Sequence, residues 1–438
     1  MALGGGEYTV MNKVLPGVYV NVRTGTSSDS EYGKRGYLAI PMFLHWGEVG
    51  KVTTITAKTF ESDSYKLIGY SSSSDEAKPF REMLKGATTL YVYRVSGGNE
   101  AKKATNANIG EALYEGIAGN NLKVVVKASL DETSKFVVDT YMGSVKLDTQ
   151  TVAKAEDLTN NDFIKFTATK LEANTYKFEG GADGTATLEA YTACEEAFQR
   201  FTFNALAVEL ADEDSIKTFV EFTKRMRDER GLKFQLVVHD YNLANYEGVV
   251  SVKNKPEGET GRDASLVYWV AGQTAGANAG ESLTGTEYDG DYTINTNYTQ
   301  LELEQSIRNG SFMFHEVNGV VRVLKDIDTL TTYTAEKGEL FSDCSVIRTI
   351  DGITSDIAIA FATMVYGKLK NNEEGREIFR TAIIETLDSY AASQAIEGVD
   401  SADITVNEVD GDKGAVTTTF SISTIGTIDK VYMTINLA

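Results

Sequence analysis

Apolar and polar residues alternate at both ends of this chain, and a period of two is the pattern of a half-buried β-strand. In the first segment, Val18, Val20 and Val22 lie on one face, and Tyr19 belongs to the same predicted strand. In the last segment, they are Val431, Met433, Ile435 and Leu437. A strand with one apolar face and unpaired backbone groups needs a sheet edge to join. The two ends therefore predict arms that link this chain to neighbouring copies by donating strands.

The segment after the first arm alternates between helix and strand patterns. Residues 25–36 are small and polar and indicate a loop. Apolar runs at 37–42 and 90–95 predict strands, and the second of these is stopped by two glycines. Between them, residues 57–70 and 75–86 have the spacing of helices. Together they predict a small α/β unit.

The pattern changes between residues 105 and 181, where short alternating runs are separated by turn residues. The runs are 122–130, 135–142, 144–148 and 163–169. Several short strands at this spacing are typical of a compact β-sandwich or barrel.

Helices and strands alternate again from 185 to 330. Helical spacing covers 188–200 and 263–277, and an acidic helix start at 212–215 precedes a further apolar stripe. The runs 204–210 and 234–238 are β-like. This alternation predicts a mainly parallel sheet covered on both faces.

The last hundred residues contain two long apolar stripes, which predict helices over 353–370 and 373–396. The hinge between them, 368–376, is dense in charge. Strand-like runs at 404–409 and 416–422 follow before the terminal arm.

The chain is thus expected to be an α+β or α/β multidomain protein, in which an α/β sheet core carries an inserted β-sandwich. We expect an N-terminal strand arm at 1–24, an α/β unit at 25–104, the inserted β-sandwich at 105–181, an α/β sheet domain at 182–332, a C-terminal α+β assembly domain at 333–427 and a C-terminal strand arm at 428–438.

Composition limits the classes of function. With 63 acidic and 42 basic side chains, the formal charge is −21, which argues against a nucleic-acid-binding surface because such surfaces need clustered Lys and Arg. The acidity is compatible with simple solubility, with delayed self-association or with a basic partner. The two cysteines have no second Cys at metal or redox spacing, so we expect reduced, partly buried thiols in a cytoplasmic protein. The start does not resemble a secretory signal, and no run of eighteen apolar residues predicts a transmembrane helix.

Candidate catalytic chemistry is sparse. The three histidines lie far apart and have no metal-binding spacing. His239 and Asp240 follow the buried run 234–238, where α/β sheets place active residues, but no Gly-x-Ser-x-Gly elbow supplies a nucleophile. The glycine-rich stretches lack the Lys-Ser/Thr ending of a phosphate loop. We therefore expect no catalytic residue, no metal and no cofactor; the charged hinge is either a solvated junction or a docking patch.

Four segments resemble the sheath proteins of contractile tails, which occur in myophages and in phage-tail-like bacteriocin particles. They are Pro16-Gly17-Val18-Tyr19, Tyr91-Val92-Tyr93-Arg94-Val95, the turn 114–120 and the passage 320–330. The match is specific because the segments keep their order and spacing across nearly the whole chain. One departure is Asp328, where the family tends to have Asn.

The resemblance implies a structural subunit rather than an enzyme. It implies hexameric rings stacked helically around an inner tail tube, which contract on a baseplate signal and drive the tube through the target cell envelope. Baseplate and tail-terminator proteins would contact the ends, with no direct nucleic-acid binding and no membrane insertion. The particle would be a virion tail or a phage-tail-like bacteriocin, assembled in the host cytoplasm and released by lysis.

By the same resemblance, the two arms pair with a neighbouring subunit by strand exchange, at an edge we expect within 404–422. Candidate inner-tube contacts lie at the charged hinge: Lys368, Lys370, Glu373, Glu374 and Arg376. Two alternatives stay open at this point, a hydrolase-like α/β oligomer that uses His239 and Asp240, and a surface-layer or adhesive protein.

Overall fold

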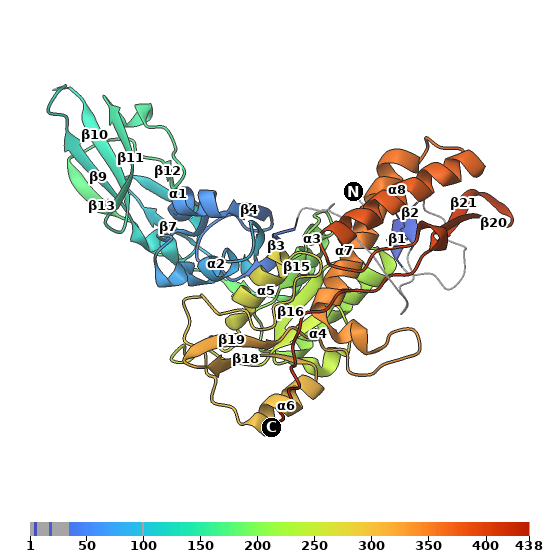
Figure 1. The fold of residues 1–438 in the computed structure, drawn as a ribbon. Coiled ribbons are helices and arrows are strands. Elements are labelled where there is room, and N and C mark those ends of the chain that lie inside the picture. The colour runs from blue at the N-terminus through green and yellow to red at the C-terminus, as the bar shows by residue number, and fades with distance from the viewer. Residues whose placement is uncertain (1–3, 7–16, 20–34, 99, 133, 438) are drawn as a thin grey trace. The chain divides into compact units, whose positions relative to one another are not determined.

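The computed structural model describes residues 4–6, 17–19, 35–98, 100–132 and 134–437 (Figure 1). The chain forms two compact units. Unit 2 consists of residues 39–84 and 88–200, and unit 1 consists mainly of residues 201–438. The α+β multidomain class predicted from the sequence is confirmed.

Unit 2 begins with the α/β segment that the helix and strand patterns predicted. Its strands are β3 (Tyr37–Met42, which starts in unit 1), β4 (Val52–Thr56) and β5 (Thr89–Arg94), and its helices are α1 (Ala57–Ile68) and α2 (Lys78–Met83). β4 and β5 pair antiparallel. Helix α1 starts where the Thr56 side chain accepts a hydrogen bond from the Thr59 amide, and it ends at Gly69, which adopts the left-handed conformation that favours glycine.

The rest of unit 2 is a β-sandwich, as predicted. One sheet has the order β11-β10-β9-β13 and the other the order β12-β8-β7. The bounds are β7 (Lys103–Asn106), β8 (Gly110–Glu115), β9 (Leu122–Ala128), β10 (Phe136–Met142), β11 (Val145–Val152), β12 (Ile164–Phe166) and β13 (Asn174–Lys177). Buried side chains from both sheets, such as Val124 and Ile164, form one core with Trp46. A short pair, β6 (Ser96–Gly97) with β14 (Thr185–Ala186), precedes helix α3 (Leu188–Phe198).

Unit 1 contains a mainly parallel sheet, again as predicted. Its strands lie in the order β19-β18-β17-β16-β15; β15 to β18 pair parallel, and β19 pairs antiparallel with β18. The bounds are β15 (Ala205–Ala207), β16 (Gln235–His239), β17 (Val249–Val252), β18 (Ser311–Val317) and β19 (Val320–Lys325). Every residue of β15, β16 and β17 is buried, as expected for parallel strands covered on both faces. The helices of this part are α4 (Glu213–Lys224), α5 (Leu266–Gly276) and α6 (Gln300–Arg308).

Two long helices and a two-stranded sheet complete unit 1. They are α7 (Cys344–Ala360), α8 (Glu373–Ala392), β20 (Thr405–Val409) and β21 (Asp412–Thr419). The helices share a core that includes Ile353, Ile383 and Leu387.

The predicted start of the first long helix, at residue 353, is wrong. Helix α7 begins at Cys344 and passes into a π-helical turn, Phe361–Val365. Two charged residues, Arg348 and Asp351, break the apolar stripe of its first turns, yet both are buried because each has a charged partner inside the protein. A periodicity of apolar residues cannot detect a helix face that is buried through ion pairs.

Candidate assembly surface

The C-terminal arm carries its apolar side chains in solvent. Residues 426–437 contain no helix or strand. The four predicted arm residues Val431, Met433, Ile435 and Leu437 are 73%, 76%, 76% and 95% exposed. Within the described part of the chain, no hydrogen bond or ion pair joins residues 430–437 to the rest of the protein. An exposed apolar row of this kind marks a surface that another molecule covers.

Just before the arm, the chain is held by the segment that follows α8. The amide of Ile425 donates to the carbonyl of Ala395 at 3.0 Å, and the amide of Glu397 donates to the carbonyl of Ser423 at 3.0 Å. Ile422 packs against the core that α7 and α8 share. The last backbone anchor of the chain is therefore Ile425.

At the other end, the described residues pair within the chain. Val18 and Tyr19 lie in β2 (Gly17–Tyr19), which pairs parallel with β1 (Gly4–Gly6). The other two predicted residues of this arm, Val20 and Val22, lie outside the described residues. Further along the chain, the Arg35 guanidinium donates to the carbonyl of Thr274 at 2.9 Å.

The segment expected to receive an arm forms a separate two-stranded antiparallel sheet. Strands β20 and β21 pair from Thr405↔Thr419 to Val409↔Asp412, with an irregularity after Glu408. The sheet contains only these two strands in the described structure, so each strand has one edge that no further strand covers. Such edges can accept a strand from another chain.

Side chains of the second long helix and the loop before it hold this sheet in place. The Asn371 amide donates to the carbonyls of Lys413 and Ala415, at 3.1 Å and 3.0 Å. Arg376 donates to the Asn371 side-chain oxygen at 3.1 Å, and Arg380 donates to the carbonyl of Ile404 at 2.7 Å. The two-stranded sheet is thereby fixed to the start of α8.

The five candidate tube contacts lie together at the junction of α7 and α8. Lys368, Lys370, Glu373 and Glu374 are exposed. Glu373 and Glu374 occupy the first turn of α8, where a negative charge is favoured by the helix dipole. Arg376 is partly buried and pairs with Glu408 at 3.4 Å, so it helps to position the two-stranded sheet as well.

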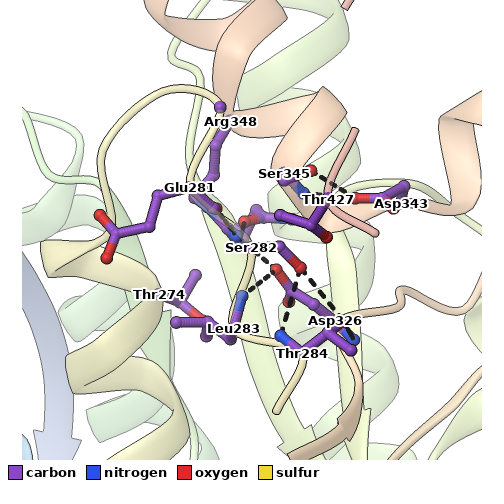
Figure 2. A network of polar contacts seen from close by, with 12 residues as sticks. Thr274, Glu281, Ser282, Leu283, Thr284, Asp326, Asp343, Ser345, Arg348 and Thr427 are labelled. Carbon is purple, nitrogen blue, oxygen red and sulfur yellow. Dashed lines mark hydrogen bonds and ion pairs between the residues drawn. The ribbon is translucent and has the colours of Figure 1, made fainter. Parts of the chain in front are cut away.

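A buried polar network fixes the first half of α7 to the sheet of unit 1 (Figure 2). Arg348 donates to the carboxylate of Asp326 and, at 2.8 Å, to the carbonyl of Glu281. The Asp326 carboxylate also accepts the amide of Leu283 at 3.0 Å. Burial lowers the pKa of Arg348, but the neighbouring Asp326 carboxylate outweighs burial and holds that pKa above its usual value. The guanidinium therefore stays charged, and it fixes the part of α7 that precedes the core shared with α8.

Sequence patterns gave no sign of Asn371, Arg348 or Lys325 as positioning residues. Each forms at least one bond with a residue more than 20 positions away, such as Arg348 with Asp326 (22 positions) and Lys325 with Asp429 (104 positions), and no local period reports such a contact. Only the charge density of 368–376 pointed to this region.

The alternative enzymatic site does not assemble around His239. This residue ends β16 and is buried, and its Nδ1 has no hydrogen-bond partner. Burial lowers the pKa of His239, so the ring is neutral at physiological pH. Asp240 follows with a φ of 44°. No Ser, Thr or Cys hydroxyl or thiol is hydrogen-bonded to the imidazole of His239 among the residues that the structure describes.

The described residues offer neither a metal site nor a membrane span. No cluster of three or more His, Cys, Asp or Glu side chains could hold a metal ion there, and no helix there is long and apolar enough to cross a bilayer. Burial raises the pKa of the Cys194 and Cys344 thiols well above the usual value, so neither is a reactive thiolate.

Four protein-family models match successive parts of the chain. They describe the N-terminal region of domain III of tail sheath protein Gp18 (residues 35–95), the phage tail sheath β-sandwich domain (97–189), the phage tail sheath central domain (184–329) and the phage tail sheath C-terminal domain (336–438). The crystal structure of a sheath tail protein from Desulfitobacterium hafniense superimposes with a TM-score of 0.82 at 34% identity, over 95% of this chain and 99% of that one. This chain belongs to the phage tail sheath family.

Two other relatives extend the comparison. The phage-like element PBSX protein XkdK of Bacillus subtilis is 29% identical over 99% of this chain and 100% of its own length. The helical sheath of the anti-feeding prophage, in its contracted state, shares the fold, with a TM-score of 0.56 at 12% identity over 98% of this chain and 100% of that one. The chain is a sheath subunit of a phage or contractile injection system. Because the sheath family is structural, the hydrolase-like alternative is wrong. Membership of the sheath family takes the place of the surface-layer or adhesive alternative.

Proposed function

We propose that this protein polymerises as hexameric rings, stacked helically around an inner tail tube, and that the array contracts to drive the tube through the envelope of a target cell. The terminal arms couple neighbouring subunits while the compact domains between them repack. The observation that carries this proposal is the exposed apolar row of the C-terminal arm, together with the two uncovered edges of the β20–β21 sheet.

Physical complementarity supports strand exchange between copies. The arm offers unpaired backbone groups and one apolar face, and the β20–β21 sheet offers strand edges that lack a neighbour. Adding a strand at such an edge satisfies backbone hydrogen bonds on both molecules and removes the arm's apolar side chains from water. The contracted helical sheath of the anti-feeding prophage has the same fold, which supports helical polymerisation of this chain.

The proposed sheath role also implies contacts with the inner tube and with the proteins at the two ends of the polymer. The inner tube meets the α7–α8 junction, where Lys368, Lys370, Glu373 and Glu374 offer charges of both signs, with Arg376 behind them. Baseplate and terminator proteins contact the two ends of the polymer. The particle is a virion tail or a phage-tail-like bacteriocin, which assembles in the host cytoplasm and leaves by lysis.

The arm can be tested with two variants of equal charge. Met433 and Ile435 lie on its apolar face, and Thr434 and Asn436 lie on the opposite face. We expect the double substitution M433D/I435D to abolish rings and tubes in electron micrographs. The matched variant T434D/N436D should still form them, because its new charges point away from the buried face.

Monomer structure is the control, measured by circular dichroism. Because all four positions lie in the exposed arm, both variants should fold as the native chain does. Normal tubes from M433D/I435D would overturn the proposal, and so would equal loss of polymer from the two variants.

The tube contact needs a separate measurement. The double substitution K368E/K370E should weaken co-sedimentation with the tube protein of the same particle and leave self-polymerisation unchanged. Unchanged co-sedimentation would place the tube contact elsewhere on the subunit.

A further inference from the structure

One lysine ties the C-terminal arm to its own subunit beyond the last backbone anchor. The Lys325 ammonium forms an ion pair with the carboxylate of Asp429, which also accepts a hydrogen bond from the Thr427 hydroxyl at 3.0 Å. The neighbouring residues Ile428 and Lys430 are exposed, whereas the Asp429 side chain is only 21% exposed. The arm is thus held at one point, four residues after Ile425.

Strand geometry directs Lys325 towards the arm. Lys325 ends β19, and successive side chains of a strand point to opposite sides. The next residue, Asp326, points inward and pairs with the buried Arg348, as Figure 2 shows. The Asp326–Arg348 pair fixes the backbone next to Lys325, so the Lys325 ammonium has a defined position at the surface.

The Lys325–Asp429 ion pair is weak, and it can open without leaving a buried charge unpaired. Lys325 also pairs with Asp343 at 3.4 Å, and the exposed fractions of these two side chains are 28% and 27%. If Asp429 departs, the ammonium keeps Asp343 as a partner and water reaches all three groups. The Arg348–Asp326 pair differs, since both of its side chains are 1% exposed. Separating that pair would leave an unpaired buried charge at a large cost in free energy.

We propose that the Lys325–Asp429 pair is a releasable clamp that sets the free length of the C-terminal arm. With the clamp closed, residues 430–438 are free to reach a second copy. With it open, the free segment begins after Ile425, because the next tie is the backbone bond from Ile425 to Ala395. The four added residues lengthen the reach of an extended arm by about 13 Å.

The clamp rests on the proposed function of the arm and adds a length adjustment to it. A sheath that changes from a long array to a short one alters the distance between an arm's root and its acceptor edge. A fixed arm would be taut in one arrangement and slack in the other. A clamp that takes up or releases four residues lets the arm stay paired in both.

The clamp can be tested in the monomer with spin labels at two exposed positions, L340C and I428C. The native cysteines, Cys194 and Cys344, are buried and do not compete for the label. At low salt, we expect a narrow distance distribution for this labelled pair. Adding D429N should broaden it, with the ratio of clamped to released molecules falling about two- to fivefold, as for other partly exposed ion pairs.

Two controls test whether the Lys325–Asp429 ion pair is what narrows the distance distribution. K430Q removes an adjacent charge outside the pair and should leave the distribution narrow. About 1 M salt should broaden the distribution of the native pair towards that of D429N, because the Debye length falls to about 3 Å. A D429N distribution as narrow as the native one, or loss of the fold by D429N, would overturn the clamp.

The test separates failure of the clamp from failure of the proposed function. D429N keeps the entire arm, so it should still form tubes; tubes from D429N with a native-like monomer distribution refute the clamp alone. Normal tubes from M433D/I435D refute strand exchange by the arm, whatever the spin labels show.

Discussion

The guanidinium of Arg227 forms two hydrogen bonds with the carboxylate of Asp351, at 2.6 Å and 2.9 Å, and both side chains are buried. Arg227 lies in the π-helical turn after α4, and Asp351 lies in α7. Burial lowers the pKa of Arg227, but the Asp351 carboxylate outweighs burial and keeps that pKa above its usual value. This pair and Arg348–Asp326 fix the first half of α7, while the second half leads to the junction with α8.

Removing one member of that pair should destabilise unit 1. D351N leaves the Arg227 guanidinium buried without a counter-charge, which typically costs about 3–5 kcal/mol. Denaturant unfolding followed by fluorescence measures the change. The control is D388N, an exposed position on α8, which should shift the free energy of unfolding by less than about 0.5 kcal/mol. Equal effects from the two variants would contradict the role of the pair.

Two aspartates only two residues apart should respond in opposite ways to the same substitution. Asp326 is the charged partner of Arg348, so D326N should lower the free energy of unfolding by about 3 kcal/mol or more. Asp328 is fully buried and forms no ion pair within the described residues, and burial raises its pKa well above the usual value. Burial therefore favours the protonated, uncharged carboxyl group, which resembles an asparagine in charge and shape.

D328N should accordingly keep the thermal midpoint at pH 7 within a few degrees of the native value. The Asp328 side chain accepts the Leu330 amide at 2.8 Å, a bond that the asparagine oxygen can retain. A large loss of stability in D328N would show that the carboxyl group is needed as such.

Asp356 should make stability depend on pH. It is buried between α7 and α8, one oxygen accepts the Tyr390 hydroxyl at 2.9 Å, and burial raises its pKa to about 7. Because the folded state holds this proton more tightly than the unfolded state, its contribution is most favourable at low pH. The contribution declines as pH rises from about 4 to 7.

D356N removes that titration. We expect it to raise the thermal midpoint at pH 8, by the equivalent of about 4 kcal/mol, and to change it little at pH 4. Scanning fluorimetry across this range measures the difference. A D356N midpoint that runs parallel to the native curve at every pH would contradict a protonated Asp356.

Asn371 should control the order of the acceptor sheet rather than the core. N371A leaves the carbonyls of Lys413 and Ala415 without their side-chain donor, a loss of about 1–2 kcal/mol of local stability. Amide hydrogen exchange across 412–419 should become faster, and tubes should form less readily. K413A keeps the same carbonyl and serves as the control, so an equal rise in exchange from K413A would contradict the assignment.

The α/β segment, the β-sandwich and the parallel sheet could all be predicted because their apolar residues repeat at the periods of helix and strand. The first turns of α7 could not, because Arg348 and Asp351 are buried through partners far away in the chain. Strands β7, β8 and β13 were also missed, since they are short and carry several exposed or partly exposed positions.

For the assembly surface, the sequence by itself determined the alternation of Val431, Met433, Ile435 and Leu437, since a two-residue period depends only on neighbouring side chains. The tertiary structure decided where that arm leaves the subunit. The Lys325–Asp429 pair joins residues 104 positions apart, and the β20–β21 sheet is held by Asn371 from another element. Such contacts depend on how the whole chain packs, because a charged side chain pairs with any opposite charge that the fold places next to it. A local sequence pattern contains no information on which distant residues become neighbours.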